Sequence, residues 1–343
     1  MSEDAPSRRR QTIRDVAEAA GVSIGTVSKA LNRSGTLRQE TRDRIVRIAT
    51  ELGFRPNDLA QSLLRGQSFT VGMISNDSFG RFTLPIMEGL ERELADRRIG
   101  IFMCNATDDP ARERQHIEQL LGKRVDGLIF TARRADRRAA IGVPLGELPV
   151  LFVYSHGPDD SAFCLVPDDE QGARLGSAHL AALGRRRIAH LTGPERFEAV
   201  RLRRAGWRAA LAEAGLPEAP YRSGAWSEAW GREAARAVFA DPTDRPDAAF
   251  AGNDQIARGL LDGLRDLGLR VPEDVAVVGF DNWDVMVEGA RPRLSSVDMN
   301  LYALGQEAGR RIMRMIGGEE FHGTLRLPCT LAVRESSTPE GSR

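Results

Sequence analysis

Residues 12–33, TIRDVAEAAGVSIGTVSKALNR, decide how this chain of 343 residues is organised. Thr12 and Asp15 have the spacing of a capping box, in which two side chains satisfy the first free N–H groups of a helix. Apolar residues then recur at helical spacing up to Gly21, which suits the left-handed position that ends a helix. A second helical pattern follows at 23–31. The segment therefore predicts two short helices joined by a tight turn.

A third helical pattern completes this unit. Residues 38–52 place apolar side chains at helical spacing and stop before Gly53. Three helices of this size bury one small core, with the apolar residues Ile13, Val16, Ala17, Ala20, Val27, Ala30, Leu31, Ile45, Ile48, Ala49 and Leu52. We predict a small all-α unit over 12–55, preceded by an unstructured tail at 1–11.

The order of helix, tight turn and helix is typical of helix-turn-helix proteins, whose second helix enters the DNA major groove. Ile24 and Gly25 would then face base edges, with Lys29 one turn later. Lys29 can donate to guanine, and Ile24 can contact a thymine methyl group. The hydroxyls of the second helix can donate to phosphates, and the predicted DNA-facing set is completed by Thr12, Ser23, Thr26, Ser28 and Asn32. The alternative is a three-helix core without a role in DNA binding.

Charge is distributed unevenly along the chain. The net charge is zero, which by itself argues against a nucleic-acid binder. Residues 1–68, however, carry 12 Lys and Arg against 8 Asp and Glu, whereas the remainder carries 36 against 40. A basic front end on a mildly acidic body indicates one module that meets polyanions and one that does not.

Cysteine and histidine usage gives no sign of a disulfide framework or a metal site. Cys104, Cys164 and Cys329 lie far apart without CxxC spacing, which predicts buried thiols. The five histidines lack metal-ligand spacing. No apolar run reaches the roughly 18 residues of a membrane span, and the N-terminus lacks the apolar core of a signal peptide. We expect a cytoplasmic protein with no metal, cofactor or membrane partner.

From Phe69 onward, strands and helices alternate. The predicted strands are rich in Val, Ile and Phe, and cover 70–75, 99–106, 126–132, 149–155, 163–167, 187–193, 248–253 and 275–282. Amphipathic helices are predicted at 84–98, 111–123, 171–184, 198–214, 230–240 and 254–268. Such alternation predicts an α/β body with parallel sheets, and its length favours two doubly wound halves separated by a cleft. Ligands of these folds bind at the carboxyl ends of the strands.

Three further patterns carry no enzymatic interpretation. Residues 21–25, GVSIG, match a nucleophile elbow, but a helix precedes them where that motif needs a buried strand. The first predicted strand, VGMISND, lacks the glycine pattern of a dinucleotide site. The Arg-rich stretch 131–138 is interpreted as a solvated loop, with the binding of an anionic group as the alternative.

The chain closely resembles the lactose-repressor (LacI/GalR) family. The resemblance rests on TIRDVAEAAGVSIGTVSKALN and ETRDRIVRIATELGFRPNDLAQSL, and continues through RVDGLIF, QGARLGSAHLAALGRRRIAHLTGP, NDQIARGLLDGLRDLGLRVPEDVAVVGFDN and LAVRESS. It covers residues 12–337 and implies a DNA-binding regulator.

The resemblance implies a hinge segment and a two-part body. Within a linker at 56–68, a hinge helix would include Asn57 among its DNA-binding residues, and Leu63 matches a leucine that wedges into the minor groove. Gln61 replaces the arginine usual there. The body, 69–337, resembles a periplasmic sugar-binding protein with subdomain one at 69–166 and 297–327 and subdomain two at 167–296 and 328–337. Residues 338–343 form a tail.

The resemblance also places an effector pocket in the cleft. The matching or neighbouring positions are Asn76, Asp77, Phe82, Thr83, Arg203, Trp226, Asn253 and Asp281. Aromatic rings suit the CH faces of a sugar, and planar polar groups suit its vicinal hydroxyls. A monosaccharide or oligosaccharide is therefore the expected effector. Met299 and Gln171 occupy positions that vary in the family and set pocket detail.

We interpret the chain as a homodimeric transcription regulator, most simply a repressor, that binds a pseudo-palindromic operator under control of a small molecule. Only SSTPEGSR follows Glu335, without the heptads of a tetramerising helix. The alternatives are a sugar-binding transport protein, an enzyme on an α/β fold, and a regulator that needs a co-repressor or a protein partner. The DNA-binding pattern opposes the first, and the lack of a nucleophile–base pair opposes the second.

Overall fold

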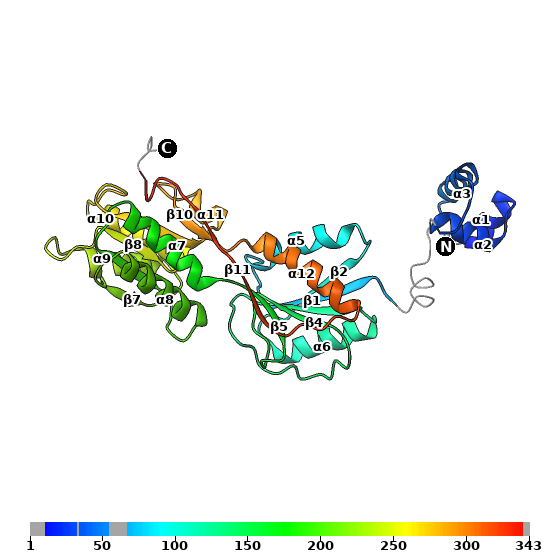
Figure 1. Cartoon of the computed structure of the whole chain (residues 1–343), viewed down its shortest axis with the longest axis horizontal. Coiled ribbons are helices and arrows are strands. Elements are labelled where there is room, and N and C mark those ends of the chain that lie inside the picture. The colour runs from blue at the N-terminus through cyan, green and yellow to red at the C-terminus, as the bar shows by residue number, and fades with distance from the viewer. Residues whose placement is uncertain (1–10, 33, 55–66, 339–343) are drawn as a thin grey trace, which may run out of the picture. The chain divides into compact units, whose positions relative to one another are not determined.

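The computed structural model of the chain describes residues 11–32, 34–54 and 67–338 (Figure 1). The chain divides between Ser68 and Phe69 into two compact units. We call the first unit the head and the second the body, and each is described by itself.

The head contains three helices around one core. They are α1 (Ile13–Ala20), α2 (Ile24–Leu31) and α3 (Gln39–Glu51). Val16, Val27 and Ile45, one from each helix, are fully buried. The predicted capping box is present at α1, and Gly21 ends that helix with a φ of 62°.

Two arginines of α3 fix the other helices, a contact that the sequence patterns did not reveal. Arg44 Nη2 donates to the carbonyl of Ala20 at 3.3 Å, and Arg42 Nη1 donates to the carbonyl of Ala30 at 3.4 Å. Both carbonyls lie at helix carboxyl ends, where cations are favoured by the helix dipole and by unpaired C=O groups. These contacts join α3 to α1 and α2, so they help to set the angles between the helices of the head.

The body begins with the first lobe, a parallel six-stranded sheet in the order β11-β5-β4-β3-β1-β2. Its strands are β1 (Thr70–Ser75), β2 (Gly100–Asn105), β3 (Gly127–Thr131), β4 (Val150–Val153), β5 (Phe163–Pro167) and β11 (Gly323–Leu327). Helices α5 (Thr83–Ala95) and α12 (Leu301–Ile316) pack together on one face, and α6 (Pro110–Gly122) covers the other (Figure 1).

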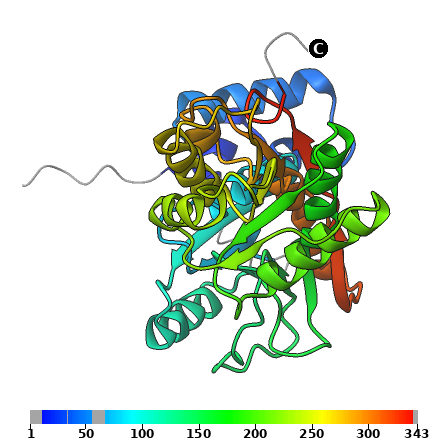
Figure 2. The same ribbon diagram turned by 90° about the vertical axis from the view of Figure 1, so that its left-hand side faces the viewer.

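The second lobe is a six-stranded sheet in the order β12-β10-β9-β8-β6-β7, parallel except for the pair β10–β12. Its strands are β6 (Ile188–Thr192), β7 (Tyr221–Ser223), β8 (Ala248–Ala251), β9 (Ala276–Asp281), β10 (Ser295–Asp298) and β12 (Thr330–Ala332). The helices are α7 (Asp169–Ala182), α8 (Glu198–Glu213), α9 (Glu228–Phe239), α10 (Asp254–Asp266) and the short α11 (Asp284–Val287). They flank the sheet on both faces (Figure 1, Figure 2).

The chain passes between the lobes three times, after β5, after β10 and after β11. Because β10 belongs to the second lobe up to Asp298, the second crossing lies slightly beyond the 296/297 boundary expected from the sequence. The body therefore consists of two doubly wound halves, which confirms the predicted α/β fold.

Six elements lie where no helix or strand was predicted: α11, α12, β7, β10, β11 and β12. β7 and β10 have the sequences YRS and SSVD, which lack the apolar character of a buried strand. Helix α12 contains Gly305, where an added Cβ would lie 2.0 Å from the carbonyl oxygen of Ile86. The glycine lowers helix propensity, but it allows α12 and α5 to approach closely. Tertiary packing therefore overrides the local preference.

Candidate functional site

Helix α2 presents the predicted base-reading residues on the side away from the core. Val27 and Ala30 are buried, whereas Gly25 and Lys29 are exposed and Ile24 is 43% exposed. An isoleucine this exposed on a small unit is available for contact with another molecule. The predicted DNA-facing residues Ile24, Gly25 and Lys29 are therefore exposed on one face of α2.

The predicted phosphate donors are tied to the head by internal bonds. Ser23 caps α2 and accepts a hydrogen bond from the backbone N–H of Thr26 at 3.1 Å. Thr12 caps α1, and its hydroxyl donates to Asp15 at 2.8 Å. Ser28 Oγ accepts from Asn32 Nδ2 at 3.3 Å. These bonds hold the side chains at the ends of α1 and α2, so their first role is to define the helices. Asn57, Gln61 and Leu63 of the predicted hinge lie outside the described residues.

A cavity of about 400 Å³ lies between the two lobes of the body. Its lining comes from both lobes and is gathered at the carboxyl ends of strands, as the topology of doubly wound sheets requires. The lining residues are Asp77, Phe79, Arg81, Phe82, Arg133, Arg134, Ala135, Asp136, Tyr154, Phe197, Ala199, Arg203, Trp226, Asn253, Gln255, Asp281 and Trp283.

The structure brings six of the eight predicted effector residues into this lining: Asp77, Phe82, Arg203, Trp226, Asn253 and Asp281. It places Asn76 and Thr83 outside it. Asn76 Nδ2 donates to Asp108 at 2.6 Å, and Thr83 is buried with its hydroxyl 2.8 Å from that of Ser75. Thr83 begins α5 and its side chain turns inward to the first lobe, so it supports the loop after β1 without lining the cavity.

Asp77 and Asn253 each accept hydrogen bonds at the start of a helix and also line the cavity. Asp77 Oδ2 accepts from the backbone N–H groups of Phe82 and Thr83, at 2.8 and 3.0 Å, at the start of α5. Asn253 caps α10, and its Oδ1 accepts from Ile256 N at 2.9 Å. Both side chains are therefore held rigidly at the cavity wall.

Arg203 is almost completely buried and already bonded. Its Nε donates to Asp169 Oδ1 at 2.7 Å and its Nη1 to the carbonyl of Gly252 at 2.5 Å. Its guanidinium also stacks 3.6 Å from the ring centre of Phe280. Burial alone would lower the pKa of Arg203, but the carboxylates of Asp169 and Asp281 outweigh burial and raise that pKa. Arg203 is therefore a fixed cation beneath the cavity.

Arg81 is a lining residue that the sequence analysis missed. It follows β1 in the first lobe, yet its Nη2 forms an ion pair with Asp281 Oδ2 at the end of β9 in the second lobe. Its Nη1 donates to Gln255 Oε1 at 3.2 Å, and its guanidinium lies 4.4 Å from the ring centre of Trp283. No residue spacing links position 81 to position 281, so only the fold could reveal this contact.

The Arg-rich stretch is a loop with partly exposed arginines, as expected, but it also forms part of the cavity wall. Arg133 Nη2 lies 2.6 Å from Asp108 Oδ2, and Arg134 Nε lies 3.5 Å from Asp136 Oδ2. Asp136 Oδ1 also accepts from the backbone N–H of Glu198 at 3.0 Å, so a first-lobe carboxylate occupies the amino end of α8 in the second lobe. Pairing of each arginine with a carboxylate explains why the stretch packs at the cleft.

The remaining lining residues that were missed are mainly aromatic: Phe79, Tyr154, Phe197 and Trp283. Phe82 stacks on Tyr154 with ring centres 4.8 Å apart, and Phe197 lies over Trp226 at 6.4 Å. Tyr154 directly follows β4, and Trp283 lies two residues after the end of β9. Their position after buried strands is a signal that the sequence contained and that we did not use.

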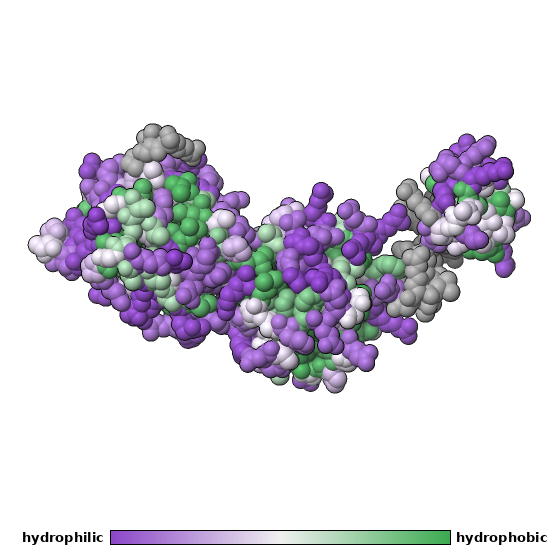
Figure 3. Space-filling view, in the orientation of Figure 1, coloured by the Kyte–Doolittle hydropathy of each residue, from purple (hydrophilic) through white to green (hydrophobic). Residues whose placement is uncertain are grey.

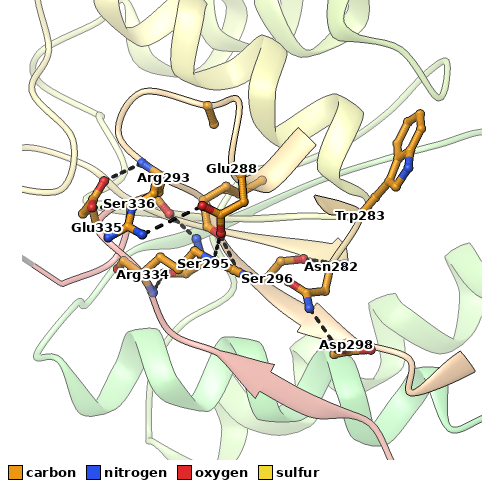
Figure 4. A network of polar contacts seen from close by, with 12 residues as sticks. Asn282, Trp283, Glu288, Arg293, Ser295, Ser296, Asp298, Arg334, Glu335 and Ser336 are labelled. Atoms are coloured by element: carbon orange, nitrogen blue, oxygen red, sulfur yellow. Dashed lines mark hydrogen bonds and ion pairs between the residues drawn. The ribbon is translucent and has the colours of Figure 1, made fainter. Parts of the chain in front are cut away.

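A network of polar contacts fixes the turn after β9 (Figure 4). Asp281 and Asn282 have φ angles of 110° and 50°, in the left-handed region that residues other than glycine seldom adopt. Asn282 N donates to Ser296 Oγ at 3.0 Å, and Asn282 Nδ2 donates to Asp298 Oδ2 at 2.9 Å. The side chain of Trp283 projects away from the network (Figure 4) and lines the cavity. The strained turn therefore sets the positions of Asp281 and Trp283.

The network continues into the segment after β12. Ser295 N donates to Ser336 Oγ at 2.8 Å, and Ser336 Oγ donates to the carbonyl of Val277 at 2.7 Å. Arg293 and Glu335 form an ion pair with Nε and Oε1 2.6 Å apart. The end of the described chain is thereby joined to β9 and β10, which carry one wall of the cavity.

Comparisons with known proteins match both units. Residues 12–57 match the family of bacterial regulatory proteins of the lacI type, and residues 177–337 match a periplasmic binding protein-like domain. The ribose operon repressor of Escherichia coli (strain K12) is 31% identical over 300 residues, which cover 87% of this chain and 90% of that protein. The chain therefore belongs to the LacI family of bacterial regulatory proteins.

Two solved structures are similar over nearly the whole length. The lac repressor dimer bound to operator and the anti-inducer ONPF has a TM-score of 0.78 and 29% identity, covering 96% of this chain and 99% of that one. The complex of the transcriptional regulator CelR with cellobiose has a TM-score of 0.67 and 29% identity, covering 96% and 100%. This protein is thus a DNA-binding transcription regulator with a helix-turn-helix head. No helix in the described ranges is long and apolar enough to cross a membrane.

Proposed function

We propose that the protein is a repressor whose binding to operator DNA is controlled by an uncharged carbohydrate bound between the two lobes. One observation carries the proposal. The cavity combines aromatic rings from both lobes with planar polar groups, and its arginines are already paired with carboxylates of the protein.

The aromatic residues offer flat apolar surfaces from two sides. Phe82 and Tyr154 come from the first lobe, and Phe197 and Trp226 from the second. The C–H faces of a pyranose pack on such rings, and its hydroxyls need donors and acceptors placed at the edges. The carboxylates and amides at the carboxyl ends of β8 and β9 fill that role, led by Asn253 and Asp281.

Charge pairing favours an uncharged ligand over an anionic one. Arg81 pairs with Asp281, Arg133 with Asp108, Arg134 with Asp136, and Arg203 with Asp169. An anion that bound Arg81 or Arg203 would have to displace Asp281 or Asp169 and leave that buried carboxylate without its partner, which is unfavourable. A neutral polyhydroxyl ligand requires no such exchange.

The names of similar proteins agree with this class of ligand. One relative is a ribose operon repressor, another is the lactose operon repressor of Escherichia coli (strain K12), and CelR was solved as a cellobiose complex. We infer that the effector of this chain is a monosaccharide or an oligosaccharide, in line with the resemblance.

The operator is proposed to be a pseudo-palindrome read by two heads. Two copies related by a twofold axis present two α2 helices to successive major grooves. Ile24, Gly25 and Lys29 would contact base edges. The segment 56–68, with Asn57 and Leu63, would add contacts in the minor groove as the family resemblance implies.

An exposed apolar surface supports the proposed dimer. Phe79 is 94% exposed, Val285 64%, Leu84 50% and Tyr302 40%, and all four line a second hollow of about 610 Å³ at the junction of the lobes. Hydrophobic residues gather where the lobes meet on the face shown in Figure 3. Contiguous exposed apolar surface marks an interaction site. A second copy that covers this surface would contact both lobes, and Val285→Asp should then give monomers in sedimentation at micromolar concentration.

Control of DNA binding would operate as a population shift. A ligand changes operator affinity only to the extent that it binds the two lobe arrangements with different affinity. Since the cavity wall is shared between the lobes, a carbohydrate that bridges the wall favours the closed arrangement. The sign of the response, release from the operator or binding to it, follows from which arrangement holds the heads correctly.

The test combines operator selection with a carbohydrate panel. A tight site is selected from random-sequence DNA, and neutral and anionic sugars are then added at one fixed salt concentration, because phosphate contacts make the affinity salt-dependent. Release or strengthening by a neutral sugar supports the proposal. A tight site that responds only to an anionic sugar refutes the uncharged ligand, and one that responds to no sugar refutes the carbohydrate class. The absence of a specific site refutes the repressor.

A further inference from the structure

Arg81 makes a direct contact between the two lobes that involves no ligand. It leaves the loop between β1 and α5, crosses the cleft, and meets Asp281 and Gln255 of the second lobe. The rings of Phe82 and Trp283 lie 4.8 and 4.4 Å from its guanidinium carbon, one from each lobe. The guanidinium is thus enclosed by groups of both lobes.

Both charges of the pair are largely removed from water. The side chain of Arg81 is 12% exposed and that of Asp281 is 5% exposed. Asp281 Oδ1 is also 3.7 Å from Arg203 Nη1, so Asp281 lies between a cation of the first lobe and a cation of its own lobe. Buried partners of an ion pair depend on each other, because loss of one leaves the other charge without compensation.

The ion pair of Arg81 and Asp281 lies between two hollows. Arg81, Asp281 and Trp283 line both the cavity of about 400 Å³ and the second hollow of about 610 Å³. The pair therefore forms part of the wall between them. A side chain in this place closes the cavity on one side and joins the lobes at the same time.

We propose that Arg81 and Asp281 form a cross-lobe clasp that holds the two lobes together before any effector binds. Opening of the cleft separates Arg81 from Asp281 and Gln255 and exposes the faces of Phe82 and Trp283. The clasp sets the closed arrangement as the starting state, so that an effector acts on lobes that are already joined.

Arg133 provides a matched comparison. It lines the same cavity and pairs with a carboxylate at 2.6 Å, but its partner Asp108 belongs to the same lobe. Its backbone N–H also donates within that lobe, to Asn76 Oδ1 at 3.0 Å. Arg133→Gln therefore removes one arginine charge from the cavity without removing a contact between lobes.

The experiment measures the distance between the lobes in the full-length protein without ligand. Spin labels are placed on cysteines introduced at Glu118 of α6 and Glu233 of α9, which are exposed positions in different lobes. The three native cysteines are buried, and protein without the introduced cysteines serves as the labelling control. Pulsed electron paramagnetic resonance then gives the distance distribution for each variant, and circular dichroism shows that each variant is folded.

The clasp predicts a specific pattern. Arg81→Gln and Asp281→Asn should each shift the distribution to longer distances and broaden it, because each removes the ion pair that joins the two lobes. The double variant should shift back toward the parent, because its two amides are neutral and can bond to each other. Arg133→Gln should match the parent. An unchanged distribution for Arg81→Gln, or an equal shift for Arg133→Gln, overturns the proposal. Neither result depends on operator or carbohydrate, so the clasp can fail or hold independently of the proposed function.

Discussion

Acidification should destabilise the second lobe through one histidine. His190 of β6 is fully buried, and its Nδ1 is 2.9 Å from the carbonyl of Phe250, to which it donates in the neutral form. Its Nε2 is buried and has no hydrogen-bond partner among the described residues. The rings of Phe250, Trp207 and Tyr221 surround it at 5.0–5.6 Å. Protonation would therefore place an unpaired charge in an aromatic core.

The magnitude follows from proton linkage. Burial lowers the pKa of His190 from its ordinary value of 6.5 to about 4. The stabilisation is present above the unfolded pKa and is lost as the pH falls toward the folded pKa, because the unfolded chain binds the proton first. The full difference between the unfolded and folded pKa values of His190 corresponds to about 3.4 kcal/mol of folding free energy. About 2.5 kcal/mol of this should be lost between about pH 8 and about pH 4.5.

A variant isolates this effect from other titrating groups. His190→Phe keeps an aromatic ring in the cage but removes the titration. Burial raises the pKa of Asp254 to about 8, which gives the opposite slope: that contribution is present at low pH and lost as the pH rises from about 4 to about 8. Since Asp254 is present in both proteins, it cancels when the two free energies of unfolding are subtracted.

Tryptophan fluorescence reports on the correct part of the molecule. All four tryptophans, at positions 207, 226, 230 and 283, lie in the second lobe. Urea unfolding followed by this signal at several pH values gives the difference between the parent and His190→Phe. The free energy of unfolding of the parent, relative to that of His190→Phe, should fall by about 2.5 kcal/mol as the pH falls from about 8 to about 4.5. A difference that stays constant over this range would show that His190 is not held neutral by burial.

Other measurements test the head and the cavity. Lys29→Ala should cost roughly 1–3 kcal/mol on the selected operator and relax base choice; an equal loss on random DNA would instead mean a phosphate contact. Trp226→Ala should weaken binding of the responsive sugar at least tenfold and leave operator affinity unchanged, as titration calorimetry can measure, whereas Phe102→Ala, on the outer strand β2, should bind normally. Arg44→Met removes the cation at the Ala20 carbonyl and should lower the local stability of α1 by about 0.3–1 kcal/mol, which is measured as faster amide hydrogen exchange. Unaltered exchange would count against that contact.

Local patterns were sufficient for the head and for the order of most body elements. The capping box at Thr12 and Asp15, the left-handed Gly21 and the apolar spacing of α1 to α3 act over a few residues, so they can be read without knowledge of the fold. The resemblance to the LacI family, carried by motifs along 12–337, agrees with the comparisons. It also directed attention to six residues that line the cavity.

The cavity itself depends on contacts between distant residues. Asn76 and Thr83 follow β1 just as Asp77 does, but only Asp77 lines the cavity: Asn76 is bonded to Asp108, and the buried hydroxyl of Thr83 lies beside that of Ser75. The sequence did not reveal that the Arg-rich stretch lines the cavity, because its partners, such as Asp108 for Arg133, are not adjacent in sequence. Gly305 is unfavourable for a helix by itself, and only the close approach of α12 to α5 explains why a glycine stands there.

The sequence by itself determined the three-helix head and the alternating α/β body, because helix capping, apolar periodicity and strand ends are local properties. The family resemblance indicated six of the residues that line the cleft. Only the tertiary structure decided which charges meet. Arg81 and Asp281 are separated by 200 positions and lie in different lobes, yet they form one buried ion pair. Such a pair has no local signal, since it arises where two sheets place their strand ends on opposite sides of one cleft.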